Sequence, residues 1–343
     1  MTPRRRDQSP DERAYVMGDI DVRAPAGSFP ISRLAPERAL RRVDRYDRRA
    51  EVTDYEVLTP TGTVRIAFRV IDDEPFVFEP GFFIGIRTEL PDVGVRRSPY
   101  CIVSVPNEER TFRLLVRLVP EGPVSYYLGD LQVGDRINFR GPSGRSMVPG
   151  RSLVPNEGFD QMVFLATGVG VGPLMALVRY LRADGFDMPM TLYWGLRLEQ
   201  DICLLDELEE LTRIAPNFRY HISLSQPPPG WTGLRGRVTE SVPPQLSSLE
   251  RTQYHLVGNG AMIAEMSRVL SDFGVSHKFI HEEVYFNVRY RPDPHSLAEI
   301  RKRFVISDPF SPYAHQQAGG LLSPENPISK RRRGATTPEP TDD

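Results

Sequence analysis

The sequence predicts an α+β barrel plus α/β architecture, in which an antiparallel β-barrel is followed by a doubly wound parallel sheet. In the first half of the chain, short runs rich in Val, Ile, Phe, Tyr and Thr alternate with turn sequences such as Thr-Pro-Thr-Gly and Glu-Pro-Gly, as in small barrels. From Asp160 onward strands alternate with helices, which is the pattern of a parallel sheet. A chain of 343 residues can bury two such cores.

These patterns divide the chain into four parts. The first and last parts are rich in Arg, Pro, Asp, Glu and Ser and show little apolar periodicity, so we expect them to lack a packed core. The parts are a mobile leader over 1–40, a barrel domain over 41–157, an α/β domain over 158–287 and an extended, largely disordered tail over 288–343.

Six strands are expected in the barrel domain, over 50–58, 63–70, 83–90, 100–105, 111–118 and 135–139. Residues 121–128 interrupt this rhythm with a glycine and a short apolar run. The segment suits either a helix that caps the barrel or a second phosphate cradle built on Gly122 and Ser125, and the residues alone favour the cap. Residues 141–144 and 149–157 are predicted to form a turn-rich linker.

The stretch from Gln161 to Leu181 is predicted to form a buried strand, a glycine turn and a helix. Gly168, Gly170 and Gly172 would let the backbone turn tightly, and Pro173 suits the first position of the helix. Free N–H groups at such a helix start favour a pyrophosphate. A plain tight connection remains the alternative, and a Walker loop is excluded because no Gly-Lys-Ser/Thr follows.

The α/β domain continues with strands over 191–194, 220–224, 254–257 and 278–285 and helices over 203–214 and 261–273. The turn Gly258-Asn-Gly260 follows one of these strands. In a doubly wound sheet, ligands bind at the carboxyl ends of the strands. This second turn therefore strengthens the prediction of a nucleotide site at that edge.

Composition excludes several classes of protein. The net charge of −2 and the dispersed charges give no electrostatic reason to expect nucleic acid or membrane binding. No apolar stretch reaches the length of a membrane span, and the N-terminus lacks the apolar segment of a signal peptide, so we expect a cytoplasmic protein. An iron–sulfur cluster held by cysteines needs four of them and this chain has two, and the scattered histidines predict no metal site.

Seven local motifs, in order from Ala50 to Phe286, resemble the motifs of one known family of proteins. In the barrel half, Glu79-Pro-Gly-Phe-Phe83 resembles Pro-Gly-Gln-Phe, and Ser98-Pro-Tyr-Cys-Ile-Val-Ser104 resembles Arg-x-Tyr-Ser/Thr-x-x-Ser. Glu121-Gly-Pro-Val-Ser125 resembles Gly-x-x-Ser, and Val133-Gly-Asp with Gly141-Pro-Ser-Gly144 resembles Gly-Asp and Gly-Pro-x-Gly. In the other half, Thr167–Pro173, Gly258–Met262 and His281–Tyr285 resemble Thr-Gly-x-Gly-x-x-Pro, Cys-Gly-Asn/Pro-x-x-Met and His-x-Glu-x-Phe/Tyr.

The family that these seven motifs resemble is the ferredoxin–NADP reductase superfamily. The resemblance implies that the barrel domain binds FAD and the α/β domain binds NAD or NADP. It implies a flavoprotein of the ferredoxin–NADP⁺ reductase class, in which a hydride passes from the nicotinamide to the flavin. The implied catalytic residues are Tyr100 and Cys101 beside the flavin ring, Glu283 for proton traffic, and Tyr285 or Phe286 on the other ring face. The other implied cofactor-binding residues are Arg97, Ser98, Ser104, Gly122, Val124, Ser125, Thr167, Gly168, Gly170, Gly172, Pro173, Gly258, Asn259 and Met262.

The chain departs from the family pattern at three site positions. Ser98 stands where the family has an arginine, and Arg97 or Arg96 could replace it by a shift of one or two residues. Cys101 replaces a hydroxyl residue, and a thiol is a weaker hydrogen-bond donor. Val257 replaces the family cysteine beside the nicotinamide.

Arginine, and not an acidic residue, follows the second strand of the α/β domain. Arg197 and Arg237 could pair with the 2′-phosphate of NADPH, whereas a site for NAD usually has Asp or Glu there. The sequence therefore favours NADPH, although Glu199 and Asp201 lie close by.

Because the chain has no motif for an iron–sulfur cluster, we expect its electrons to pass to a separate acceptor protein such as ferredoxin, flavodoxin or an oxygenase component. A reductase of free flavin or oxygen, and a non-catalytic scaffold, are the alternatives. The oligomeric state is not predicted.

Overall fold

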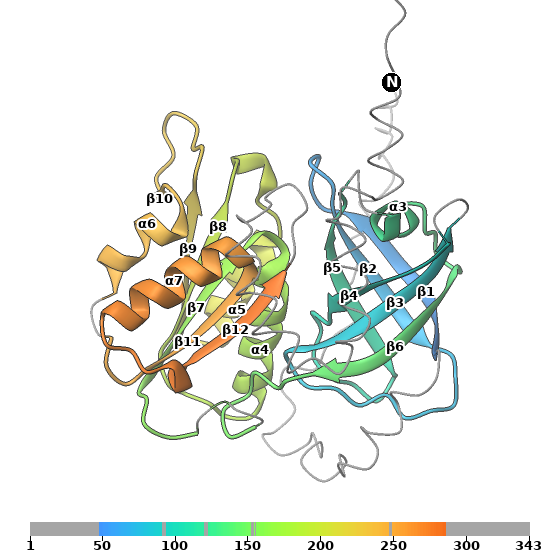
Figure 1. Ribbon diagram of the computed structural model, residues 1–343, viewed down its shortest axis with the longest axis horizontal. Helices are drawn as coiled ribbons and strands as arrows, with labels where there is room; N and C mark the ends of the chain where they lie inside the picture. The colour runs from blue at the N-terminus through green and yellow to red at the C-terminus, as the bar shows by residue number, and fades with distance from the viewer. Residues whose placement is uncertain are drawn as a thin grey trace, which may run out of the picture.

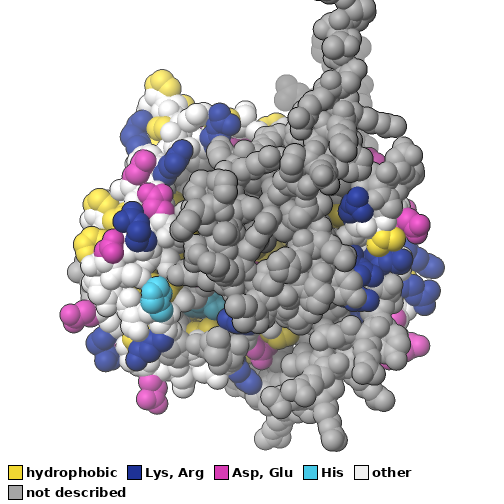
Figure 2. All heavy atoms as spheres, in the orientation of Figure 1, with side chains coloured by type: hydrophobic (Ala, Val, Ile, Leu, Met, Phe, Trp, Pro, Cys, Tyr) yellow, Lys and Arg dark blue, Asp and Glu magenta, His cyan; other side chains and the backbone are white. Residues whose placement is uncertain are grey.

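The computed structural model describes residues 48–90, 94–119, 123–151, 154, 156–246 and 249–285. The predicted leader over 1–40, the tail over 288–343, Gly122 and Phe286 lie outside these ranges. On the face shown in Figure 2, basic and acidic side chains are interspersed over the described surface. Within these ranges no helix is both long and apolar enough to span a bilayer.

The first sheet is antiparallel, with the strand order β4-β3-β6-β1-β2-β5. A bridge between Ile102 and Leu114 joins its two edges, so the sheet closes into the expected barrel (Figure 1). The strands are β1 (Arg48–Val57), β2 (Thr63–Val70), β3 (Phe82–Leu90), β4 (Gly94–Cys101), β5 (Thr111–Arg117) and β6 (Arg136–Gly144).

Two barrel strands differ from the prediction. The fourth strand was expected over 100–105 but covers Gly94–Cys101, and the sixth continues through the predicted linker residues to Gly144. Gly144 and Ser143 pair with Phe82 and Phe83, next to a register shift between Phe83 and Gly85. A bulge in an antiparallel pair tolerates the glycine and proline of this segment.

Aromatic side chains fill the barrel. Phe68 stacks on Phe112 with ring centroids 5.0 Å apart. Phe76 and Phe139 also pack against the Phe112 ring. Helix α3 (Pro123–Gly129) adds Val124 and Leu128 to this core, as the capping interpretation predicts.

The second sheet is parallel, with the strand order β10-β9-β8-β7-β11-β12. The chain runs outward from β7 in one direction and then returns to β11 on its other side, so the sheet is doubly wound with its switch point between β7 and β11. The strands are β7 (Gln161–Thr167), β8 (Met190–Leu196), β9 (Phe218–Leu224), β10 (Leu234–Arg235), β11 (Thr252–Asn259) and β12 (Ile280–Tyr285).

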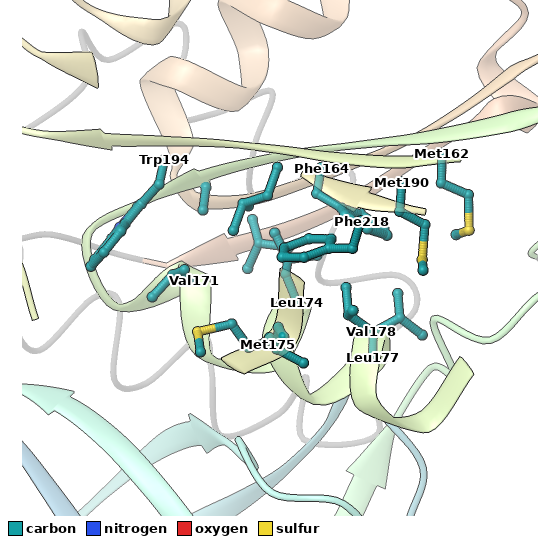
Figure 3. Packing of buried hydrophobic residues seen from close by; sticks show 14 of the residues in the cluster. Met162, Phe164, Val171, Leu174, Met175, Leu177, Val178, Met190, Trp194 and Phe218 are labelled. Atoms are coloured by element: carbon teal, nitrogen blue, oxygen red, sulfur yellow. The ribbon is translucent and has the colours of Figure 1, made fainter. Parts of the chain in front are cut away.

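Helices cover both faces of the parallel sheet. Helices α4 (Val171–Ala183) and α5 (Leu205–Ile214) cover the face that carries Phe164 and Trp194, as Figure 3 shows for α4. Helices α6 (Val238–Ser241) and α7 (Gly260–Asp272) cover the face that carries Val163 and Leu165. Residues of β7 therefore alternate between two cores, as expected for a strand buried on both sides.

Helix α4 begins two residues before the predicted start at Pro173. A single 3₁₀ turn over Gly168–Gly170 precedes it, and Gly170 is its N-cap. Pro173 thus occupies the third helical position, where its missing N–H still belongs to the groups that have no partner within the helix.

Candidate functional site

The two glycine turns at the switch point are joined directly. The Thr167 hydroxyl at the end of β7 accepts a hydrogen bond of 2.8 Å from the backbone N–H of Asn259, at the end of β11. Gly258 has φ +132°, and a Cβ placed there would lie 2.3 Å from Thr167 Oγ1, so only glycine allows this approach. The Asn259 side chain caps α7 by accepting from the N–H groups of Ala261 and Met262.

Trp194 holds the first of these turns in place. Its indole Nε1 donates a hydrogen bond of 2.8 Å to the carbonyl of Gly168, and its side chain is buried. Sequence reasoning did not select Trp194 as a site residue. A buried tryptophan at the carboxyl end of a strand is a usable signal, because its N–H needs a partner.

The start of helix α4 lies where the two domains touch. No side chain caps its first turn, so the positive end of the helix dipole suits an anion such as a pyrophosphate. The Val171 N–H is bonded within the preceding turn and Pro173 has none, which leaves the other N–H groups of the turn for the anion. A Cβ on Gly172 would lie 2.6 Å from Val103 Cγ1 of the barrel, and 3.4 Å from Leu115 Cδ2. Glycine is needed here for the contact between domains, while Gly170 passes close to the Val257 carbonyl.

Cys101 at the end of β4 meets two residues of β12. The Cys101 thiol donates a hydrogen bond of 3.8 Å to Glu283 Oε1. The Tyr285 hydroxyl lies near enough to act on the pKa of the thiol, which it lowers. Glu283 and Tyr285 are two residues apart on one strand and therefore share a face of the sheet. The structure thus brings three of the four predicted catalytic side chains together, from both domains.

The Cys101 thiol and the Tyr285 phenol are neutral hydrogen-bonding groups at pH 7. Burial, and then the nearby Glu283 carboxylate, raise the pKa of the Cys101 thiol well above its usual range. Burial likewise raises the pKa of the Tyr285 phenol. Neutral, partly buried groups of this kind suit an aromatic ligand with polar edges.

The other residues of the Ser98–Ser104 segment point in different directions. Tyr100 pairs with Ile84 and packs against the barrel core, and burial raises its pKa. Arg97 stands opposite Arg87 on the outer face of β3 and β4, and Ser98 stands opposite Ile86. The Ser104 hydroxyl accepts a hydrogen bond of 3.1 Å from the N–H of Arg113.

In α3, Val124 is buried in the barrel core, and the Ser125 hydroxyl accepts a hydrogen bond from the N–H of Val119. Met262 is also buried, in the core beneath α7. The side chains of these three residues therefore support the fold around the predicted cofactor positions.

Arginines lie at the carboxyl end of β8 and beyond β10. Arg197 is exposed, with its Nε 3.3 Å from Gln226 Oε1, and Arg237 is exposed at the start of α6. Arg235, which sequence reasoning did not select, belongs to β10, and its guanidinium donates a hydrogen bond to the Trp231 carbonyl. These side chains offer positive charge at the carboxyl edge of the sheet, where a doubly wound sheet usually binds its ligand.

Among the described residues, no group of three or more His, Cys, Asp or Glu side chains could hold a metal ion. A nucleotide fits the residues present, because the uncapped start of α4 favours an anion. A flavin fits as well, because the neutral Cys101 thiol and Tyr285 phenol offer hydrogen bonds to the polar edge of a ring.

Comparison with known proteins agrees with this geometry. The family model of the oxidoreductase FAD-binding domain matches residues 51–147, and that of the oxidoreductase NAD-binding domain matches residues 164–268. The fold and the junction thus define a two-domain flavoprotein oxidoreductase with one domain for FAD and one for a nicotinamide nucleotide. The chain belongs to the ferredoxin–NADP reductase family.

Relatives in this family serve different acceptors. The chain is 33% identical over 231 residues to ferredoxin–NADP reductase B of Sorangium cellulosum, covering 64% of this chain and 90% of that protein. It is 31% identical over 231 residues to NADH–cytochrome b5 reductase 1 of Candida glabrata, covering 64% and 77%. The crystal structure of a cytochrome P450 reductase from Amycolatopsis superposes with a TM-score of 0.60 at 26% identity, covering 70% and 69%.

Proposed function

We propose that this protein passes a hydride from NADPH to FAD and then single electrons to a separate protein acceptor. The observation that carries the proposal is the meeting of Cys101 with Glu283 and Tyr285 from the other domain. When bound, FAD supplies an acceptor for the hydride, which is two electrons with one proton, and releases those electrons one at a time.

The residues at the junction then have distinct roles. Tyr100 and Tyr285 would hold the flavin ring, and the neutral Cys101 thiol would offer it a weak hydrogen bond. Glu283 accepts from the Cys101 thiol and so could hold or move a proton at that sulfur. The N–H groups at the start of α4 would bind the nucleotide pyrophosphate.

NADPH is the proposed nucleotide because of the charges at the β8–β10 edge. Arg197, Arg235 and Arg237 could pair with a 2′-phosphate. Asp201 does not compete for that position, because its carboxylate accepts hydrogen bonds from Thr61 and Arg117 of the barrel. We propose the ferredoxin–NADP⁺ reductase class on this basis.

The proposed acceptor is a ferredoxin, a flavodoxin or an oxygenase component, by analogy with the relatives. The proposed compartment is the cytoplasm, since both Cys101 and Cys203 are free thiols, as expected in a reducing environment.

A visible spectrum of the purified protein, followed by anaerobic titration with NADPH and NADH, tests the proposal. We expect flavin absorbance that bleaches at a lower concentration of NADPH than of NADH. Turnover should rise when ferredoxin, flavodoxin or cytochrome b5 is added, and the most effective of these indicates the acceptor class. A colourless protein that takes up no added FAD would contradict the proposal, and turnover with free flavin alone would favour a free-flavin reductase.

A further inference from the structure

Glu207, in the first turn of α5, joins the two domains through its two carboxylate oxygens. Oε1 forms an ion pair with Arg65 on β2 of the barrel, and Oε2 forms one of 2.7 Å with Arg179 on α4. Each of the two carboxylate oxygens thus pairs with an arginine of a different domain. Burial alone would lower the pKa of Arg65, but Glu207 and Glu56 outweigh it and raise that pKa.

Asp201, six residues earlier, has the same bridging arrangement. Its Oδ1 accepts hydrogen bonds from the Thr61 hydroxyl at 2.6 Å and from Arg117 Nη1 at 3.2 Å, both in the barrel domain. Its Oδ2 accepts a hydrogen bond of 3.2 Å from the N–H of Leu198, in its own domain. We call these two carboxylates with Thr61, Arg65, Arg117 and Arg179 the interdomain clamp.

The clamp is more shielded from water than an ordinary surface ion pair. The side chains of Asp201, Glu207 and Arg65 are 13%, 17% and 16% exposed. In the Arg268–Asp272 pair on α7, by contrast, the side chains are 68% and 67% exposed. Charges in partly buried pairs are screened less by solvent and salt, and loss of one partner leaves the other charge poorly solvated.

The clamp fixes helix α4 at a second point. The start of α4 touches the barrel where Gly172 meets Val103, which is two residues after Cys101. Arg179, seven residues further along α4, is tied through Glu207 to Arg65. At 1.5 Å per residue these points lie about 10 Å apart, so the helix is held against rotation as well as against separation.

We propose that Asp201 and Glu207 are positioning residues, which hold the nucleotide-binding start of α4 at a fixed distance from Cys101 and Tyr100. This inference rests on the proposed function, because a hydride moves only when its donor and acceptor atoms are closely aligned. A misplacement of about 1 Å can slow such a step on the order of 100-fold. The clamp therefore controls the rate of flavin reduction and not the binding of either cofactor.

The test uses the full-length protein with Glu207→Gln and Asp201→Asn, and Asp272→Asn as the matched control in an exposed pair. Stopped-flow measurement with saturating NADPH should show flavin reduction slowed about 10- to 100-fold in the two clamp variants. FAD content and NADPH affinity should stay within about twofold of the parent, and the control should match the parent.

Hydrogen exchange of the protein without nucleotide gives a second readout that does not depend on activity. Backbone amides of β2, α4 and α5 should exchange faster in the clamp variants than in the parent. If either carboxylate variant fails to fold, Thr61→Val removes one hydrogen bond to Asp201 with little change of shape and should show the same effects more weakly.

Unchanged rates of flavin reduction in the folded clamp variants would overturn the inference, whatever the exchange measurement shows. A parent protein that neither nucleotide reduces would instead refute the proposed function. In that case the exchange measurement still tests whether the clamp holds the two domains together.

Discussion

Trp194 sets the shape of a turn to which it does not belong. Its indole reaches from β8 to the Gly168 carbonyl, while the Thr167 hydroxyl next to that carbonyl holds the Asn259 N–H. The turn after β7 is therefore fixed from both neighbouring strands. A turn fixed before a ligand arrives loses little freedom on binding, which favours affinity.

We predict that Trp194→Phe weakens NADPH binding by up to about tenfold and leaves the FAD content unchanged. The change removes the indole donor that fixes the Gly168 carbonyl, which keeps only the Val171 N–H. The loss of one hydrogen bond that pre-orders the turn costs about 0.5–1.5 kcal/mol, of which 1.4 kcal/mol is tenfold in affinity. Isothermal titration with NADPH measures the effect. Tyr193→Phe, on the opposite face of β8, is the control, and equal affinities in both variants would contradict the prediction.

The glycines of the two turns and Thr167 could be predicted as site residues from the order of their motifs, but Trp194 could not. A motif is local in sequence, whereas Trp194 contributes through a contact with a turn 26 residues away. The roles predicted for Glu283 and Tyr285 stay predictions, although the structure does place both side chains beside Cys101.

Among the elements, the first barrel strand is anchored by a buried ion pair. Arg48 at the start of β1 is 2% exposed, contacts Asp72 at 2.7 Å, and lies over the rings of Phe76 and Phe139. Burial tends to raise the pKa of Asp72, but the hydrogen bonds from Arg48 and from backbone N–H groups outweigh it and lower that pKa. The carboxylate thus balances a charge inside the barrel.

We predict that Asp72→Asn lowers the free energy of unfolding by about 3–5 kcal/mol at pH 7, because it leaves Arg48 buried without a counter-charge. A carboxyl whose pKa is lower in the folded state stabilises the fold above its unfolded pKa, about 3.9, and loses that contribution as the pH falls. The difference in the free energy of unfolding between the parent and the Asp72→Asn variant should therefore become smaller below about pH 4.

Urea unfolding at several pH values measures this difference. Glu51→Gln, on the same strand but in an exposed pair with Arg136, should cost less than about 1 kcal/mol. A difference for Asp72→Asn that stays constant between pH 7 and pH 3 would argue against the role of the charge.

Most elements were predictable from alternation and turn residues, and the two misplaced strands have a physical cause. The outer face of β4 carries Arg97 and Pro99, so its polar sequence resembles a loop, whereas the apolar residues after it resemble a strand. In β6, Gly141-Pro142 resembles a turn, but pairing with β3 across a bulge keeps the segment in the sheet. Tertiary pairing overrides local propensity in both cases.

For the whole molecule, the critical contact is Gly172 against the barrel. A methyl group there would lie 2.6 Å from Val103 Cγ1, which is far inside van der Waals contact. One of the two elements would have to move, and both lead into the candidate site. The separation of the domains is therefore set partly by the absence of one side chain.

We predict that Gly172→Ala slows flavin reduction on the order of 100-fold while the FAD content stays unchanged, because the start of α4 is displaced from the barrel. Val103→Ala in the same protein removes the obstructing methyl groups and should restore most of the rate. Stopped-flow reduction by NADPH measures both variants. Failure of the second substitution to rescue the first would show that the contact with Val103 is not the cause.

The division into a barrel and a parallel sheet followed from composition and periodicity, whereas the way the domains meet did not. Arg65 and Glu207 are 142 residues apart, and neither belongs to a motif. Contacts of this kind depend on the shapes of two finished domains, so local patterns carry no signal for them.

The strand order of the parallel sheet has a practical consequence for protein engineering. The arginine-bearing loops follow β8 and β10 on one side of the sheet, whereas β12, with Glu283 and Tyr285, forms the opposite edge. On the proposed assignment of these residues, we expect that coenzyme preference can be redesigned by exchanging loops on the first side while Glu283 and Tyr285 stay unchanged. Variants made in this way would keep the same residues beside Cys101 and differ only in whether they oxidise NADPH or NADH.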